Sequence, residues 1–207
     1  MNYPICISLP TPFGIGPVNA YLFVGSAPTL VDCGVDTDES WNALVSGLAR
    51  HNLSVSDIRH IIITHAHIDH MGMASRIVAN SAANVLIWED IAPWAYETER
   101  MWRHRMRFLH ATLHQYDMST KMRDGILSGM SKSLTMWHSV PKERVGTFSL
   151  SDKIAIGPWA WDVIYAPGHS NTQTCFYQKA TGQLLGGDML LTLTPTPVLE
   201  PPLTGGL

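Results

Sequence analysis

Three histidines and an aspartate fall within the segment THAHIDHMG, residues 64–72. These four side chains, His65, His67, Asp69 and His70, are all of types that bind metal ions. His65 and His67 are two positions apart, so in extended chain leaving a strand their rings point the same way and can converge on one ion. Asp69 and His70 follow at the turn into a helix and can face a second ion about 3.5–4 Å from the first. The spacing predicts a compact metal site.

Two later segments place further metal-binding side chains at strand ends. APGHS puts His169 after the strand predicted at WDVIY, and GGDML puts Asp188 after the strand predicted at QLL. Loops of this kind commonly hold ligands in open α/β sheets. Taken alone, either residue is better explained as part of a turn, so each becomes a candidate ligand because of the histidine cluster.

The segments around these motifs predict the framework that positions them. Short β-branched or aromatic runs bounded by glycine or proline predict strands at CISL, VNAYLFV, TLVDCG, IRHIIIT, NVLIW, KIAIG, WDVIY, TCFYQ and QLL. Helices are predicted over residues 36–52 and 73–81. Asp36 or Thr37 can cap the first helix, and its apolar face is expected to consist of Trp41, Leu44, Val45 and Leu48. The alternation of strands and helices predicts an α/β layered fold.

Residues 90–140 differ from the rest of the chain and predict a helical insertion between two strand-rich portions. Apolar side chains recur there at helical spacing, at Trp102, Met106, Leu109 and Leu113. The insertion also carries aromatic residues that either form a lid over the metal site or simply pack together: Trp94, Tyr96, Trp102, Phe108 and Trp137. Its arginines, with Glu97 and Glu99 beside them, indicate a solvated helix face more than a nucleic-acid groove: Arg100, Arg103, Arg105 and Arg107.

Composition places the chain among globular proteins. With 207 residues, 45% of them hydrophobic, it is long enough for a single domain over 1–207, with a proline-rich, loop-like tail over 194–207. The net charge of −3 favours neither nucleic acid nor an anionic membrane as a partner. The N-terminal residues lack the features of a secretory signal, so a cytoplasmic location is expected. Cys6, Cys33 and Cys175 are expected to be reduced core thiols.

Taken together, the motifs resemble those of the metallo-β-lactamase fold superfamily. Its signature, His-x-His-x-Asp-His after a strand, is matched by residues 65–70. APGHS and GGDML resemble its third histidine and bridging aspartate, and LVDCG resembles its aspartate-glycine turn. The resemblance implies an αββα sandwich, with two mixed sheets between helical layers, a helical insertion between the halves and an incomplete C-terminal half.

The resemblance also implies a role for each candidate ligand. A first metal would be bound by His65, His67 and His169, and a second by Asp69 and His70, with Asp188 bridging the two. An aspartate at the bridging position is typical of the glyoxalase II-like branch, so antibiotic hydrolysis is disfavoured. Asp32, in LVDCG, is expected to orient the histidine loop without binding metal.

The activity expected from this set is hydrolysis of a small molecule. Zinc is the expected metal, in one or two copies, although iron or manganese also suits these ligands. A hydroxide generated at the metals would attack a thioester, ester or lactone-like substrate, and Asp69 would hold the nucleophile and help to handle its proton.

Three other interpretations stay open. A persulfide dioxygenase-like oxidoreductase would hold one iron through His65, His67 and Asp188, and a nuclease would act on nucleic acid. Relatives also supply a further histidine to the second metal, whereas 19 residues follow Asp188 (207 − 188) and none is histidine. We therefore expect a truncated form with a weakened second site. The sequence leaves the oligomeric state open.

Overall fold

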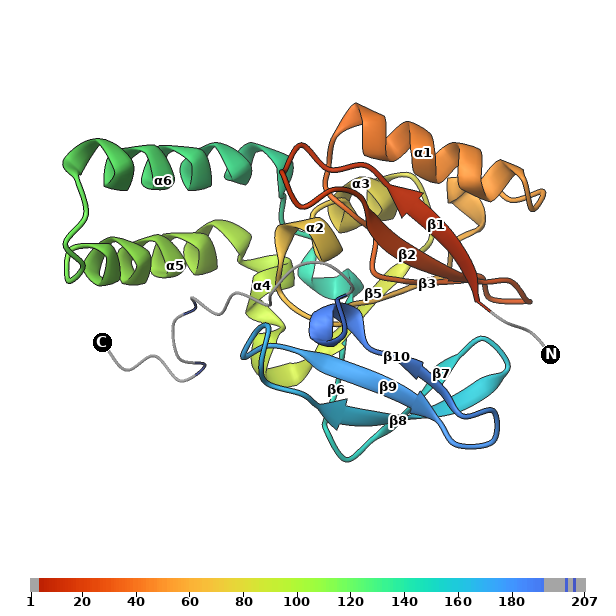
Figure 1. Ribbon diagram of the computed structural model, residues 1–207. Helices are drawn as coiled ribbons and strands as arrows, with labels where there is room; N and C mark the ends of the chain where they lie inside the picture. The colour runs from red at the N-terminus through yellow and green to blue at the C-terminus, as the bar shows by residue number, and fades with distance from the viewer. Residues whose placement is uncertain (1–3, 192–199, 201–202, 204–207) are drawn as a thin grey trace.

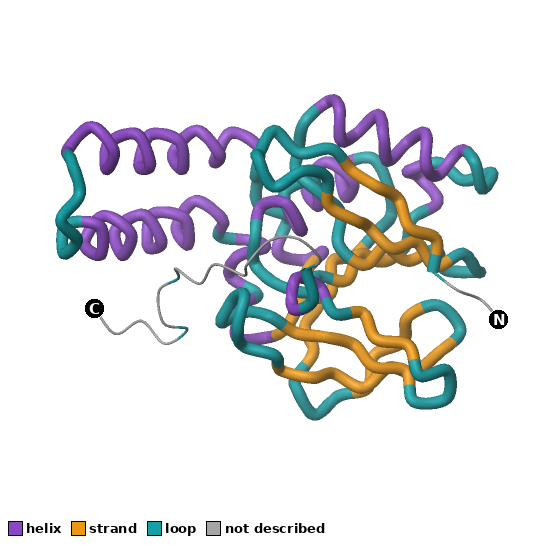
Figure 2. Tube along the Cα trace, in the orientation of Figure 1, coloured by secondary structure: helices purple, strands orange, loops and turns teal. Residues whose placement is uncertain are grey.

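Two β-sheets face each other in the computed structural model, which describes residues 4–191, 200 and 203 (Figures 1 and 2). The first sheet has the order β1-β2-β3-β4-β5-β6, and its strands are β1 Ile5–Leu9, β2 Val18–Phe23, β3 Thr29–Val31, β4 His60–Ile62, β5 Asn84–Trp88 and β6 Val145–Phe148. The second has the order β10-β9-β8-β7, and its strands are β7 Lys153–Ile156, β8 Trp159–Tyr165, β9 Thr174–Gln178 and β10 Gln183–Leu185.

Strand direction differs between the two sheets. In the first sheet β1, β2 and β3 pair antiparallel, whereas β3, β4, β5 and β6 pair parallel. Every described pairing in the second sheet is antiparallel. The expectation of two mixed sheets is therefore wrong for the second sheet, whose strands are joined by short turns that need no crossover helix. Strand β6 was not predicted, because VGTF is short and its glycine weakens the strand pattern.

Helices cover the outer side of the first sheet and extend from one end of the molecule (Figure 1). The α-helices are α1 Asp38–Ala49, α2 Ile68–Met71, α3 Ala74–Ala79, α4 Pro93–Tyr96, α5 Thr98–Leu113 and α6 Thr120–Ser133. Single 3-10 turns are η1 Val55–Asp57, η2 Glu89–Ile91, η3 Leu134–Met136, η4 Lys142–Arg144 and η5 Gly187–Met189. The architecture is thus α/β with two sheets and helices, as predicted.

Helix α1 forms where the sequence predicts it. The Thr37 side chain accepts a hydrogen bond from the Ser40 backbone N–H, which caps the first turn. Leu44 and Leu48 are fully buried against the first sheet. Val45, however, is 39% exposed, so its assignment to the apolar face is wrong.

The predicted helical insertion contains α4, α5 and α6, and the last two lie side by side as a hairpin (Figure 1). The predicted apolar stripe of α5 faces inward, with Trp102, Leu109 and Leu113 buried. Trp94 stacks on Trp137 with ring centroids 5.4 Å apart, and Trp102 meets Trp137 edge-on. Most of the aromatic set therefore packs as core.

The three cysteines differ in exposure. Cys33 and Cys175 are buried and free as expected, but Cys6 is exposed because it lies on the face of β1 opposite to the buried Ile7 and Leu9. Apart from Glu200 and Leu203, the tail predicted from Thr194 onward lies outside the described residues. In the described part of the chain, no helix has the length and apolar character that crossing a bilayer requires.

Candidate metal centre

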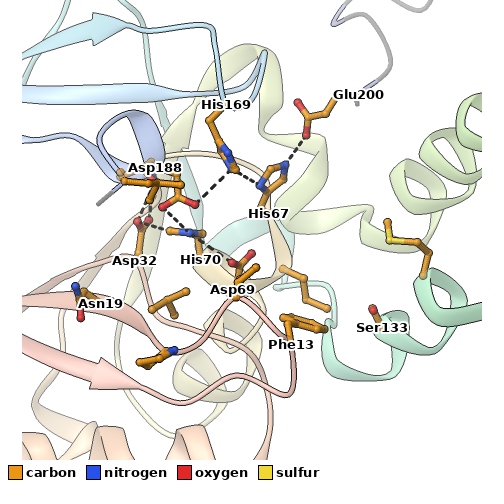
Figure 3. A pocket seen from close by; sticks show the side chains of 18 of the residues that line it. Phe13, Asn19, Asp32, His67, Asp69, His70, Ser133, His169, Asp188 and Glu200 are labelled. Carbon is orange, nitrogen blue, oxygen red and sulfur yellow. Dashed lines mark hydrogen bonds and ion pairs between the residues drawn. The ribbon is translucent and has the colours of Figure 1, made fainter. Parts of the chain in front are cut away.

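The candidate ligands come from strand ends of both sheets. Asp32 follows β3, and the loop with His65, His67 and the short helix α2 follows β4. Because β3 and β4 are parallel neighbours, their carboxyl ends meet at the same edge of the first sheet. His169 follows β8 and Asp188 lies in η5, just after β10, so the second sheet supplies the remaining ligands (Figure 3).

Three imidazole nitrogens converge in the first group. Nδ1 of His67 lies 3.1 Å from Nε2 of His65 and 2.9 Å from Nε2 of His169. In a tetrahedral zinc site, with Zn–N bonds of about 2.0–2.1 Å, neighbouring nitrogens are separated by about 3.3 Å. The described residues therefore have a donor set and a spacing that fit one metal ion at this position.

A second group shares His65 with the first. It consists of His65, His70 and Asp188, whose ligand atoms all lie within 4.8 Å of one another. One Asp188 oxygen lies 3.3 Å from Nε2 of His70 and the other 3.4 Å from Nε2 of His169. Nε2 of His70 is buried and has no hydrogen-bond partner among the described residues. Asp188 thus belongs to the second group and also reaches His169 of the first. The nitrogen that His70 can offer to a second ion is Nε2, once the ring is neutral.

Asp69 belongs to neither group but lies beside them. Its nearer carboxylate oxygen is 3.8 Å from Nε2 of His70. The side chain is 11% exposed and faces a cavity. The structure therefore brings all six predicted site residues together, and their assignment as metal ligands stays a prediction.

Asp32 controls which nitrogens of two histidines face the site. Its carboxylate accepts hydrogen bonds from the Thr64 hydroxyl at 2.8 Å and from Nδ1 of His70 at 2.8 Å. Since the Thr64 hydroxyl donates its single proton to Asp32, it accepts from Nδ1 of His65, which is 2.9 Å away. In the neutral form of each ring, Nε2 is then the unprotonated nitrogen that faces the site. Asp32 itself has φ +59°, a left-handed conformation that aspartate tolerates better than most residues.

The pKa values of His65 and His70, the two buried histidines of this loop, are shifted in opposite directions. Burial, together with the positive charge of neighbouring histidines, lowers the pKa of His65 well below its usual value, which keeps the ring neutral. Burial alone would also lower the pKa of His70, but the carboxylates of Asp32 and Asp188 raise it well above the usual value. In the absence of metal His70 therefore carries a proton that an ion must displace.

Two residues of the site were missed by the sequence analysis. Glu200 lies 2.6 Å from Nε2 of His67, and Arg105 lies 2.5 Å from the same carboxylate oxygen. Burial raises the pKa of Glu200, but the hydrogen bond from His67 and the charge of Arg105 bring it down to about 2. Arg105 is 7% exposed, so its assignment to a solvated face is wrong, whereas Arg100 and Arg103 pair with Glu97 and Glu99 there. No local pattern marks either residue.

A cavity of about 880 Å³ opens beside the cluster. Asp69, His70 and Asp188 lie on its wall, and apolar side chains from the N-terminal loop and the helices line much of the remainder: Phe13, Ile15, Ile68, Trp102, Ile126 and Met130. Figure 3 shows five of the metal-binding candidates together beside this space: His67, Asp69, His70, His169 and Asp188. A small molecule held there would touch both polar and apolar walls.

Comparison with known proteins identifies the family. The model of the metallo-beta-lactamase superfamily matches residues 13–205. The chain belongs to this superfamily. A probable metallo-hydrolase, YqjP, of Bacillus subtilis is 32% identical over an alignment of 206 positions, and the match covers 97% of this chain and 61% of that relative. The chain thus spans less than two thirds of the relative's length.

Solved structures show the same fold for this superfamily member. A metallo-beta-lactamase family protein of Thermus thermophilus, TTHA1429, is 24% identical with a TM-score of 0.71, covering 92% of this chain and 60% of that one. A beta-lactamase domain protein of Burkholderia ambifaria is 20% identical with a TM-score of 0.70, covering 93% and 56%. Both confirm the two-sheet architecture implied by the sequence motifs.

Proposed function

We propose that this superfamily member is a zinc-dependent hydrolase that acts on a thioester, ester or lactone-like small molecule. The observation that carries the proposal is the pair of converging ligand groups, which share His65 and border a cavity of about 880 Å³. The similar protein of Bacillus subtilis, itself described as a probable metallo-hydrolase, agrees with it.

The residues divide the chemistry between them. Zinc bound in such a site supplies a Lewis acid and lowers the pKa of water toward about 7. Asp69 faces the cavity, where its carboxylate can hold the attacking water and accept a proton. Asp32 keeps His65 and His70 oriented for binding.

The shape of the cavity favours a substrate with an apolar acyl portion. Ile126 and Met130 of α6 and Phe13 of the N-terminal loop form walls that can exclude water from such a group. We also propose that the substrate is a small molecule, that the protein is cytoplasmic and that it has no nucleic-acid partner.

The alternative iron site depends on His65, His67 and Asp188. The described ligand atoms converge in two other groups, one with His169 in place of Asp188 and one with His70 in place of His67. We therefore favour the hydrolase over the dioxygenase.

Metal content and substrate choice test the proposal together. Protein purified without added metal is analysed for zinc, iron and manganese and assayed with thioesters, esters, lactones and phosphodiesters. We expect zinc, and activity in the first three classes that is lost in His67→Ala and kept in His51→Ala, a change at an exposed histidine. Stoichiometric iron with oxygen consumption, or cleavage of phosphodiesters alone, contradicts the proposal.

A further inference from the structure

Glu200 occupies the side of His67 that faces away from the ligand group. Its Oε1 lies 2.6 Å from Nε2 of His67, while Nδ1 of the same ring points at His65 and His169. The Glu200 side chain is 5% exposed. Figure 3 shows the Glu200 carboxylate beside the ring of His67, with a dashed line between them.

The contact with Glu200 gives His67 a hydrogen-bond partner on the ring nitrogen that faces away from the site, as His65 and His70 also have. Nδ1 of His65 donates a hydrogen bond to the Thr64 hydroxyl, and Nδ1 of His70 donates one to the Asp32 carboxylate. For His67 the described partner of the ring nitrogen that faces away from the site is Glu200. A carboxylate that accepts a proton from one ring nitrogen fixes the tautomer and the orientation in which the other binds metal.

Glu200 is itself held from three directions. Oε1 accepts a hydrogen bond from Nη2 of Arg105 at 2.5 Å. Oε2 accepts hydrogen bonds from the Ser170 hydroxyl at 2.5 Å and from the Asn171 backbone N–H at 3.0 Å. Since Ser170 and Asn171 directly follow the candidate ligand His169, one carboxylate joins two ligand loops that are about a hundred positions apart in the sequence.

Arg105 ties this carboxylate to the helical insertion. It belongs to α5, where its guanidinium lies 4.3 Å above the ring of Trp94 and Nη2 lies 3.3 Å from the carbonyl oxygen of Ala66, between His65 and His67. An arginine so packed has little freedom to move.

We propose that Glu200 is a positioning residue for the first metal, which holds His67 in its binding orientation, and that Arg105 fixes Glu200 in place. The inference rests on the proposed metal dependence of the site. Through Arg105 and Glu200, the helical insertion would then set the orientation of His67 without contacting the ion.

Zinc affinity of the full chain tests the proposal. The metal-free protein competes with a chromophoric chelator for zinc, as the unmodified chain and as Glu200→Ala, Glu200→Gln and Arg105→Met. We expect Glu200→Ala to weaken the first zinc by about 10- to 100-fold and Glu200→Gln, which keeps an acceptor oxygen, by less. The control is Glu97→Gln, which removes the carboxylate of an exposed ion pair on the same insertion and is expected to leave affinity unchanged.

Two further readouts separate positioning from general damage. The cobalt(II) absorption spectrum of the first site should change in Glu200→Ala and stay unchanged in the control. Arg105→Met should weaken zinc in the unmodified background and add little in Glu200→Ala, because both changes act through one carboxylate. Additive losses overturn the role of Arg105, and unchanged zinc affinity in both Glu200 variants overturns that of Glu200.

The metal-free protein provides a measurement that does not depend on zinc. An imidazole N–H proton resonance, assigned by its absence in His67→Ala, should disappear or shift in Glu200→Ala, and its persistence unchanged overturns the proposal. If the unmodified chain binds no zinc, the proposed function fails, and this resonance still decides whether Glu200 holds His67.

Discussion

At the scale of single residues, substitutions at His67 and Asp69 should have different consequences, because His67 belongs to a ligand group and Asp69 lies beside both groups. His67→Ala removes one of three converging nitrogens, so we expect loss of the first zinc and of nearly all activity. Asp69→Asn should keep the first zinc but lower turnover by about 100-fold or more, because an amide cannot accept the proton. Zinc analysis and steady-state kinetics of both variants check this. Full metal content and full rate in His67→Ala contradict the assignment.

The raised pKa of His70 predicts that zinc binding releases a proton. Zinc needs the neutral ring, and His70 is charged below its raised pKa. Affinity for the second ion should therefore fall as the pH falls through and below that pKa. Calorimetric titration in buffers of different ionisation enthalpy should show about one proton released per second ion near pH 7.

Asp32→Asn tests whether the Asp32 carboxylate causes this proton release. The backbone should be kept in this variant, because asparagine also tolerates the positive φ found at this position. Without the carboxylate, the pKa of His70 should fall and fewer protons should be released on binding. Proton release equal to that of the unmodified chain would show that Asp32 does not hold the charge of His70.

At the scale of elements, the close fit of α2 should make its end intolerant of a side chain. A Cβ at Gly72 would lie 2.5 Å from the carbonyl oxygen of Ile68 and 2.9 Å from that of Met136, both backbone atoms that cannot turn aside. We expect Gly72→Ala to lower the free energy of unfolding by about 1–3 kcal/mol, as measured by chemical denaturation.

The control for this prediction is a glycine with free space around it. Gly129 lies in α6, and a Cβ there meets nothing within 4 Å. Gly129→Ala should stabilise the chain slightly, by up to about 1 kcal/mol, since alanine favours helix. Equal behaviour of the two variants would show that α2 is not packed as described.

Helix α6 is expected to contribute to substrate choice as a wall of the cavity. Ile126→Ala combined with Met130→Ala removes apolar surface there and should raise the KM for long-chain substrates about 2- to 10-fold with little change in kcat. Met122→Ala, at a position of the same helix that is 60% exposed, is the control. A KM that does not change in the double variant excludes α6 from the binding site.

Trp102 of α5 also lines the cavity but is a poor probe of substrate binding, because its burial makes loss of the ring destabilising.

At the scale of the whole molecule, local patterns predicted most of the framework but not its long-range pairs. The strand runs, the cap at Thr37 and the histidine signature are readable because each depends on neighbours in sequence. The contacts of Glu200 with Arg105 and His67 span 95 and 133 positions and are created by the fold. A buried arginine and a solvated one look alike in sequence, which is why Arg105 was misassigned.

The fold brings two sheets together so that neither holds the complete site. His65, His67 and His70 come from the first sheet, and His169 and Asp188 from the second. Metal binding should therefore stabilise the contact between the sheets as well as supply chemistry.

The number of zinc ions that the full chain binds is measured by titrating the metal-free protein against a chelator of known affinity. We expect two ions of unequal affinity: a tight one held by His65, His67 and His169 and a weaker one that must displace the proton of His70. Two equally tight ions would contradict the unequal roles of the two ligand groups, and a chain that binds no zinc would contradict the metal centre itself.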